Sequence, residues 1–324
     1  MSPSVLCACG KKWPEVIAAG RNRPALPSNR HPCTATENPP HLRSMPEIPV
    51  TSTAIAAICL ELVMMLAGLV LLWRVAFSPA ARAQPPVKHL TVWAITWVDF
   101  LMFVWYIVLC ALLFQAGVVY ALKKLGPLTE QSQILAGLAA QVGALAGCGA
   151  FRFLRPFRPT FDYFNPAPEA AQRLPFAAGL VTFLIVLPLL SGTALVWQGL
   201  LELFGVEAAP QSLVDTFISN KSPAFAALLI FFAVVVAPVT EELVFRRGFF
   251  RFARQHLPRW AGLLVPALIF GALHANLASF VPLVVLGVVF SLAYERTGNI
   301  AVTMIAHGIF NLNSVFLIYA GVNQ

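Results

Sequence analysis

Long apolar runs separated by short polar segments dominate the chain from residue 50 onward. Most runs approach the roughly 20 apolar residues that an α-helix needs to cross a bilayer. Apolar and polar residues do not alternate within them, which excludes a transmembrane β-barrel. We therefore predict an all-α fold, a polytopic transmembrane bundle of about eight helices, over residues 50–74, 92–121, 133–152, 176–203, 223–256, 260–276, 279–294 and 299–321.

The first 44 residues do not share this pattern. They are rich in Pro, Asn, Arg and Ser and contain no apolar segment of the signal-peptide type. We interpret 1–44 as a disordered tail or as an over-extended gene start, with Met45 as the alternative first residue. Residues 45–174 then carry the early membrane helices, and residues 175–324 carry the late helices, which hold most of the polar candidates described below.

Composition supports a membrane protein and excludes two other classes. Charged residues make up 11% of the chain and hydrophobic residues 58%, so neither a soluble enzyme nor a disordered protein fits. Thirteen Lys and Arg lie in the odd-numbered loops against three in the even-numbered ones, which predicts that the odd loops face the cytoplasm. The net charge of +8 therefore indicates contact with membrane lipids, and we expect no nucleic-acid partner.

The six cysteines suggest no disulfide framework. Cys59, Cys110 and Cys148 lie singly in apolar runs and are interpreted as packing residues. In the tail, a zinc site made by Cys7, Cys9 and Cys33 with His31 stays open as an alternative, although the spacing is poor for zinc.

Charged residues within the fifth run are the first candidates for chemistry, because ionisable groups in a membrane span are costly. Glu242 and Arg246 are four positions apart, so on a helix they share a face and can form an ion pair. Glu241 points about 100° away and has no local partner. A carboxylate of that kind suits general-base chemistry.

Two later spans add imidazole and amide groups. His274 lies in the sixth span, and His307 and Asn311 lie four positions apart in the eighth. If the chain turns at residues 257–258, Glu241 and His274 reach a similar depth in the membrane. A straight-helix arrangement does not bring His307 level with them.

Other polar or small residues in the spans have less specific interpretations. Glu61 is near mid-span and is expected to pair with a basic or amide group or to line a cavity, while Asp99 is expected at the interface. Gly143 and Gly147 form a GxxxG pair, which predicts close helix packing. Finally, a polar access route from the cytoplasm to the site is expected along Arg247, Arg251 and Arg254.

Three motifs in order resemble the CAAX protease and bacteriocin-processing family, the intramembrane proteases related to the Ras-converting CAAX endopeptidase. The resemblance covers about residues 222–320 and implies hydrolysis of a peptide bond in a membrane-associated or lipidated protein or peptide substrate. It implies that Glu241 activates water with help from His274, that His307 and Asn311 stabilise the oxyanion, and that Glu242 and Arg246 form a structural pair. The motif residues are Glu241, Glu242 and Arg246, then Phe270 and His274, then His307 and Asn311.

Several alternatives stay open at this point. The resemblance leaves unresolved whether a divalent metal such as zinc or the glutamate itself activates water; the chain has no HExxH motif. A proton-coupled transporter would use Glu61, Asp99 and Glu241 as a relay. A non-catalytic membrane binding protein of the immunity type would retain the motifs for packing. In a bacterial source we expect the protein in the cell inner membrane.

Overall fold

The computed structural model describes residues 51–83, 90, 95–154, 175–206 and 222–322. The predictions for the tail, including the zinc alternative at Cys7, Cys9, His31 and Cys33, lie outside the described residues. All the helices of the described residues lie within residues 50–324.

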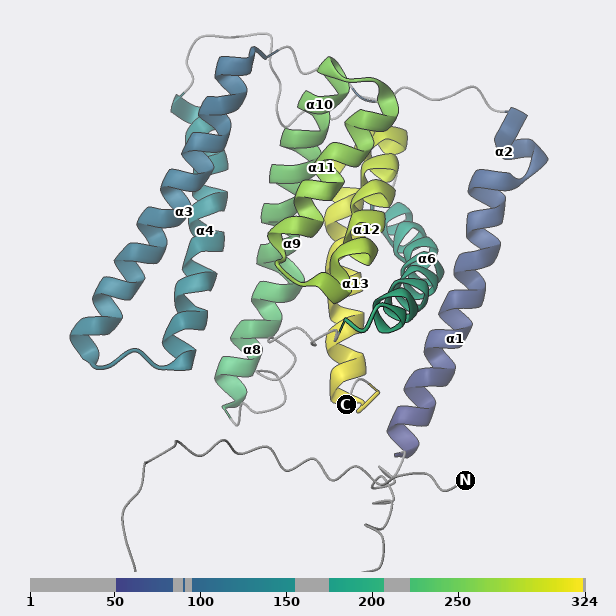
Figure 1. Cartoon of the computed structure of the whole chain (residues 1–324), viewed down its shortest axis with the longest axis horizontal. Helices are drawn as coiled ribbons and strands as arrows, with labels where there is room; N and C mark the ends of the chain where they lie inside the picture. Colours follow the sequence, from purple (N-terminus) through teal and green to yellow (C-terminus); the bar gives the residue numbers. More distant parts are fainter. Residues whose placement is uncertain (1–50, 84–89, 91–94, 155–174, 207–221, 323–324) are drawn as a thin grey trace, which may run out of the picture. The chain divides into compact units, whose positions relative to one another are not determined.

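Helices account for all regular secondary structure in the described residues, which confirms the predicted all-α membrane bundle (Figure 1). Three short segments, labelled η, are π-helical, with hydrogen bonds that span five residues. The elements are α1 (Ser52–Leu72), η1 (Trp73–Phe77), α2 (Pro79–Ala83), α3 (Trp97–Leu125), α4 (Glu130–Leu154), α6 (Pro175–Leu203), α8 (Pro223–Phe231), η2 (Phe232–Val236), α9 (Ala237–Glu241), η3 (Glu242–Phe250), α10 (Arg251–His256), α11 (Arg259–Leu273), α12 (Leu277–Thr297) and α13 (Ile300–Tyr319).

Seven helical segments of the described residues are long and apolar enough to cross a membrane, so the protein is a multi-pass integral membrane protein. The fifth of them is the continuous segment Pro223–His256, which runs from α8 through α10. The predicted span 260–276 differs from the structure: α11 has 15 residues and ends at Leu273. At 1.5 Å per residue it is shorter than the roughly 30 Å apolar core of a bilayer.

Polar side chains define several helix ends. Thr96 and Asp99 form a reciprocal capping box at the start of α3. Asn276 accepts a hydrogen bond from the backbone N–H of Ser279 and so caps α12. Gly298 ends α12 with a left-handed φ of 64°, a conformation that glycine adopts without steric cost.

The predicted GxxxG packing is confirmed between α3 and α4. A Cβ on Gly143 would lie 2.4 Å from the carbonyl oxygen of Cys110, and a Cβ on Gly147 would lie 2.5 Å from that of Tyr106. Only hydrogen at these two positions lets the backbones approach so closely. In Figure 1, α3 and α4 run side by side as an antiparallel hairpin.

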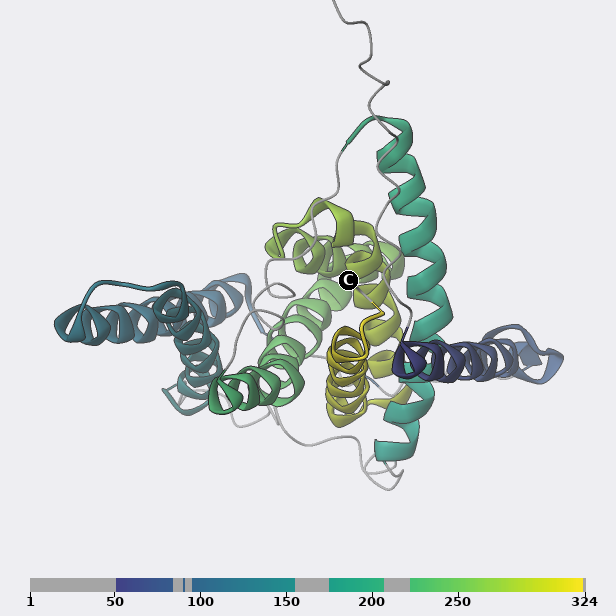
Figure 2. The ribbon, with the colours of Figure 1, turned by 90° about the horizontal axis from the view of Figure 1, so that it is seen from below.

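Around the predicted site, α6 packs against α1, α12 and α13, while α11 packs against α12. Figures 1 and 2 together show α6 running across the direction of α1 and α13. A cluster of buried apolar side chains from α6, η3, α11, α12 and α13 fills the space between these elements. Its members are Phe183, Val186, Leu187, Leu190, Phe245, Phe270, Leu286, Phe290 and Ala306.

Candidate active site

The fifth span carries both glutamates at a change in helix type. Glu241 is the last residue of α9, and Glu242 is the first residue of the π-helical segment η3. A second π-helical segment, η2, and Pro238 precede them. π-helical turns and proline both disturb the regular hydrogen-bond ladder of a helix, and π-helical turns recur at functional sites.

Glu242 and Arg246 form the ion pair that their spacing predicts. Arg246 Nη1 lies 2.8 Å from Glu242 Oε1, and both side chains are fully buried. The guanidinium also lies over two aromatic rings, 4.6 Å from the centre of Phe270 and 5.3 Å from that of Phe290. Cation–π contact and the ion pair together hold this charge inside the bundle.

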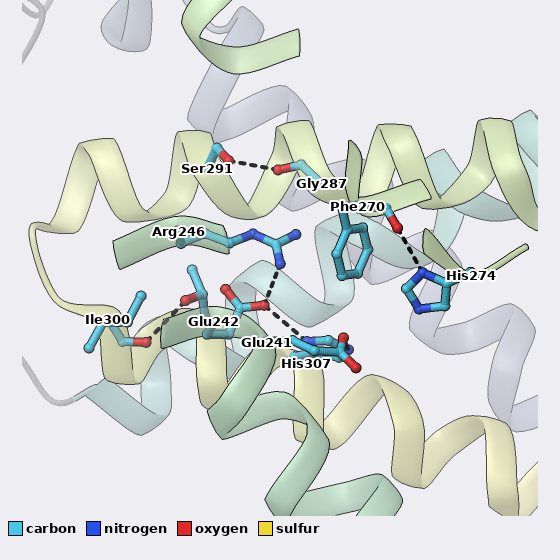
Figure 3. Close-up of polar contacts among 10 residues, drawn as sticks. Glu241, Glu242, Arg246, Phe270, His274, Gly287, Ser291, Ile300 and His307 are labelled. Carbon is cyan, nitrogen blue, oxygen red and sulfur yellow. Dashed lines mark hydrogen bonds and ion pairs between the residues drawn. The ribbon is translucent and has the colours of Figure 1, made fainter. Parts of the chain in front are cut away.

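His307 lies between the two glutamates (Figure 3). Its Nδ1 is 2.9 Å from Glu242 Oε1, and its Nε2 is 3.8 Å from Glu241 Oε2. Since a carboxylate only accepts, the Nδ1–H donates to Glu242, and Nε2 is left facing Glu241. The structure therefore places His307 level with the carboxylates, which the straight-helix arrangement did not predict.

His274 caps the C-terminus of α11, where the chain turns towards α12. Its Nδ1 donates to the carbonyl oxygen of Phe270 over 2.8 Å, which leaves Nε2 as a proton acceptor in the neutral ring. Both histidines contact the ring of Phe270, with centroid separations of 4.8 Å for His274 and 6.3 Å for His307. The Phe270 ring therefore packs against both imidazoles (Figure 3).

Exposure distinguishes the two carboxylates. The side chain of Glu241 is 18% exposed, whereas that of Glu242 is fully buried. Glu242 Oε1 also accepts hydrogen bonds from two partners, Arg246 and His307. Glu241 is thus the carboxylate of this pair that water or a substrate can reach.

Asn311 lies one helical turn beyond His307 and bonds to a different group. Its Nδ2 donates to the backbone carbonyl of Ala233 in η2 over 2.7 Å. The oxyanion role that the resemblance implies for Asn311 stays a prediction.

The remaining membrane carboxylate, Glu61, is linked to the late helices by an amide. Asn313 Nδ2 donates to Glu61 Oε2 over 3.1 Å and so joins α13 to α1. This agrees with one of the two interpretations given for Glu61. Sequence reasoning did not single out Asn313 or Phe290; an amide in an apolar span was the available signal for Asn313, whereas Phe290 offered none.

The predicted access route past the arginines is wrong for this structure. Arg247 and Arg251 are both buried, each with 5% of its surface exposed. Arg254 and Arg259 instead converge on Glu295 of α12, at 2.9 and 2.7 Å. At the arginine-rich end of the segment Pro223–His256, Arg247 and Arg251 are therefore packed between helices, and Arg254 is held in an ion pair with Glu295. Exposed residues of the site lie at the other end of α11, from Ala272 to Ala275 and including His274.

Among the described residues, no three His, Cys, Asp or Glu side chains are arranged to hold a metal ion. Zinc sites usually take three protein ligands. In addition, Glu242 Oε1 accepts hydrogen bonds from both His307 Nδ1 and Arg246 Nη1.

Comparison with protein-family models finds a match in the late part of the chain. Residues 223–313 match the family model of the Rce1-like type II CAAX prenyl endopeptidases. The UPF0177 protein YbdI of Lactococcus lactis is 30% identical over 105 residues, which cover 32% of this chain and 53% of YbdI. The "Putative membrane peptidase YdiL" of Bacillus subtilis is 31% identical over 84 residues, which cover 26% of this chain and 34% of YdiL.

The matched segment thus spans about half or less of the length of these relatives. No solved structure matches the chain. Every residue of the three motifs, from Glu241 to Asn311, lies inside the segment that the family model covers. Residues 223–313 of the chain are therefore similar to the Rce1-like family of type II CAAX prenyl endopeptidases.

Proposed function

We propose that the protein is an intramembrane endopeptidase that hydrolyses a peptide bond of a membrane-associated or lipidated protein or peptide, with Glu241 as the general base. The observation that carries this proposal is the asymmetry of the glutamate pair. Glu242 is buried and bonded to Arg246 and His307, whereas Glu241 is reachable and faces the Nε2 of His307.

In the first step, Glu241 takes a proton from a water molecule, and the water oxygen forms a bond to the scissile carbonyl carbon. The Nε2 of His274, whose Nδ1–H is held by the Phe270 carbonyl, accepts a hydrogen bond from the same water and orients it. The carbonyl oxygen takes up the negative charge of the tetrahedral intermediate.

In the second step, the carbon–nitrogen bond breaks and the proton held by Glu241 moves to the leaving amine. The products are a new carboxylic acid, which then ionises, and a new amine, so one water is consumed per bond. His307 stabilises the oxyanion from Nε2 when the ring carries a second proton, and Glu242 supports that imidazolium through Nδ1. Arg246 balances the charge of Glu242.

The test uses full-length protein in liposomes with two substrate arms. One arm is a set of membrane-spanning peptides, and the other is a farnesylated peptide that ends in Cys-a-a-X. Mass spectrometry in ¹⁸O-water shows whether one labelled oxygen enters the new carboxylate. Glu241→Gln is the inactive control, and Glu61→Gln is a matched carboxylate control in a different helix.

Cleavage by the wild-type protein that Glu241→Gln abolishes and Glu61→Gln retains supports the proposal. The arm that is cut identifies the substrate class. Failure to cut either arm, together with pH-driven uptake of a solute into the liposomes, would instead favour the transporter. Equal cleavage by wild type and Glu241→Gln would remove Glu241 from the mechanism.

A further inference from the structure

A three-residue turn joins α11 to α12 and carries His274 at its first position. The end of α11 is tightened, because the N–H groups of His274 and Ala275 bond to the carbonyls three residues back, over 3.3 and 3.0 Å. Asn276 then caps α12 by accepting hydrogen bonds from the N–H and the hydroxyl of Ser279, each over 2.9 Å. Local hydrogen bonds therefore fix the backbone at both ends of the turn.

Between these ends, Ala275 has a left-handed backbone. Its φ is 49°, the only positive φ at a residue other than glycine in the part of the chain that the structure describes. An alanine is strained there, because its Cβ crowds the following carbonyl oxygen. Such strain persists where surrounding contacts hold the chain in place, and it recurs at active sites. A contact from another helix would supply that constraint.

The indole of Trp197 in α6 makes such a contact. Its Nε1–H donates to the backbone carbonyl of Leu277, the first residue of α12, over 2.7 Å, although 80 positions separate the two residues. A tryptophan in a membrane span commonly directs its N–H towards the membrane–water interface. Here the N–H is used on the backbone of another helix, two residues after Ala275. The bond therefore ties α6 to the turn that carries His274.

The backbone of this turn also decides which nitrogen of His274 is available. Nδ1 reaches the Phe270 carbonyl over 2.8 Å, across one helical turn, while His274 keeps near-helical angles of φ −77° and ψ −9°. In a neutral imidazole, the hydrogen bond of one nitrogen sets the protonation of the other. If the turn relaxed, Nδ1 would lose its acceptor, and Nε2 would no longer be the defined proton acceptor.

We propose that Trp197 is a positioning residue, whose indole N–H holds the strained α11–α12 turn and thereby keeps Nε2 of His274 as the free acceptor. The inference rests on the proposed function, in which that nitrogen orients water. Trp197 acts through the backbone and touches no reacting atom. It lies outside residues 223–313, so a helix beyond the segment matched by the family model takes part in the site. The rival role for this indole is direct contact with the substrate.

A second-site rescue separates the two roles. Trp197→Phe removes the N–H and keeps an aromatic ring, whereas Ala275→Gly removes the strain, because glycine adopts a positive φ without steric cost. Full-length wild type, both single variants and the double variant are compared in liposomes, and kcat and KM are measured with the peptide that the wild type cleaves. Trp105→Phe is the matched control, because Trp105 lies in α3 and is 62% exposed.

For the positioning role we expect Trp197→Phe to lower kcat about tenfold with little change in KM, the effect of one lost hydrogen bond. In the Ala275→Gly background the same change should lower kcat by no more than about threefold, because no strain is released. Trp105→Phe should keep kcat within about twofold of wild type. If Trp197→Phe does not fold, benzothienylalanine incorporated at position 197 replaces the N–H by sulfur in a ring of the same shape.

The His274 ring supplies a readout that needs no substrate. In protein labelled with ¹⁵N-histidine, the two imidazole nitrogens of His274 are assigned by comparison with His274→Gln, and their shifts distinguish a protonated Nδ1 from an unprotonated Nε2. We expect this distinction in the neutral ring of the wild type. Trp197→Phe should average the two shifts, and the double variant with Ala275→Gly should recover the distinction.

Equal losses of kcat in both backgrounds, or an effect on KM alone, overturn the inference and give Trp197 a role in substrate contact. A His274 spectrum that Trp197→Phe leaves unchanged overturns it as well. A wild-type protein that cuts neither peptide, but whose His274 spectrum shows the loss and the recovery, contradicts the proposed function and leaves the positioning of His274 established.

Discussion

His307 Nδ1 lies 2.9 Å from Oε1 of Glu242, although 65 positions separate the two residues in the chain. The contact joins α13 to the start of η3 and turns the other imidazole nitrogen towards Glu241. Arg246 bonds to the same Glu242 oxygen. One buried carboxylate therefore orients both a histidine and an arginine.

Replacing Glu241 should remove catalysis and leave the fold intact. Glu241→Gln keeps the side-chain volume, and its parent is partly exposed, so we expect a melting temperature close to wild type. Loss of a general base typically costs about 10²–10⁴ in rate. Single-turnover cleavage in liposomes gives the rate. If Glu241→Gln retains more than about a tenth of the wild-type rate, the base must be another group.

Breaking the buried ion pair should act on stability first. Arg246→Ala leaves the carboxylate of Glu242 without its cation, and stranding a buried charge costs about 3–5 kcal/mol. The double variant Glu242→Gln with Arg246→Met should be milder, because no charge is stranded. Thermal unfolding in detergent measures both. A fully stable but inactive Arg246→Ala would assign Arg246 to the reaction itself.

Close packing of α3 and α4 should tolerate no methyl group at the contact. Gly143→Ala places a Cβ 2.4 Å from the carbonyl of Cys110, so the helices must separate and the melting temperature should fall. Gly149→Ala is the control on the same helix, because a Cβ there meets nothing within 4 Å. Helix propensity alone favours Ala over Gly by about 1 kcal/mol. Equal effects at both positions would show that the backbone contact is unimportant.

Thiol labelling should find the arginine-rich end closed. In a cysteine-free background, Arg259→Cys should react with a charged reagent added from the cytoplasmic side, because the Arg259 side chain is 47% exposed and the loop charges predict that this turn faces the cytoplasm. Arg251→Cys, at a buried position, should react from neither side.

Two results would contradict this expectation. Labelling of Arg251→Cys from the cytoplasm would restore the access route along the arginines. Labelling of Arg259→Cys only from outside would invert the predicted topology, since the excess of Lys and Arg in the odd loops is what assigns those loops to the cytoplasm.

The sequence by itself determined the membrane class, the approximate spans and the contacts between near neighbours. Apolar run length is a local property, so the spans follow from composition along the chain. The Glu242–Arg246 pair was predictable because residues four apart share a helix face. The Gly143–Gly147 pair was predictable because small residues at that spacing permit close backbone contact.

Only the tertiary structure decided how the site is assembled. His307 meets Glu242, Asn311 meets Ala233, and Phe290 lies beside Arg246 because separate helices start at particular depths and cross at particular angles. Pro238 signals a disturbance in its helix, but it does not say that η2 becomes π-helical. The burial of Arg251 likewise depends on which helices close over it, and residue spacing carries no information about that.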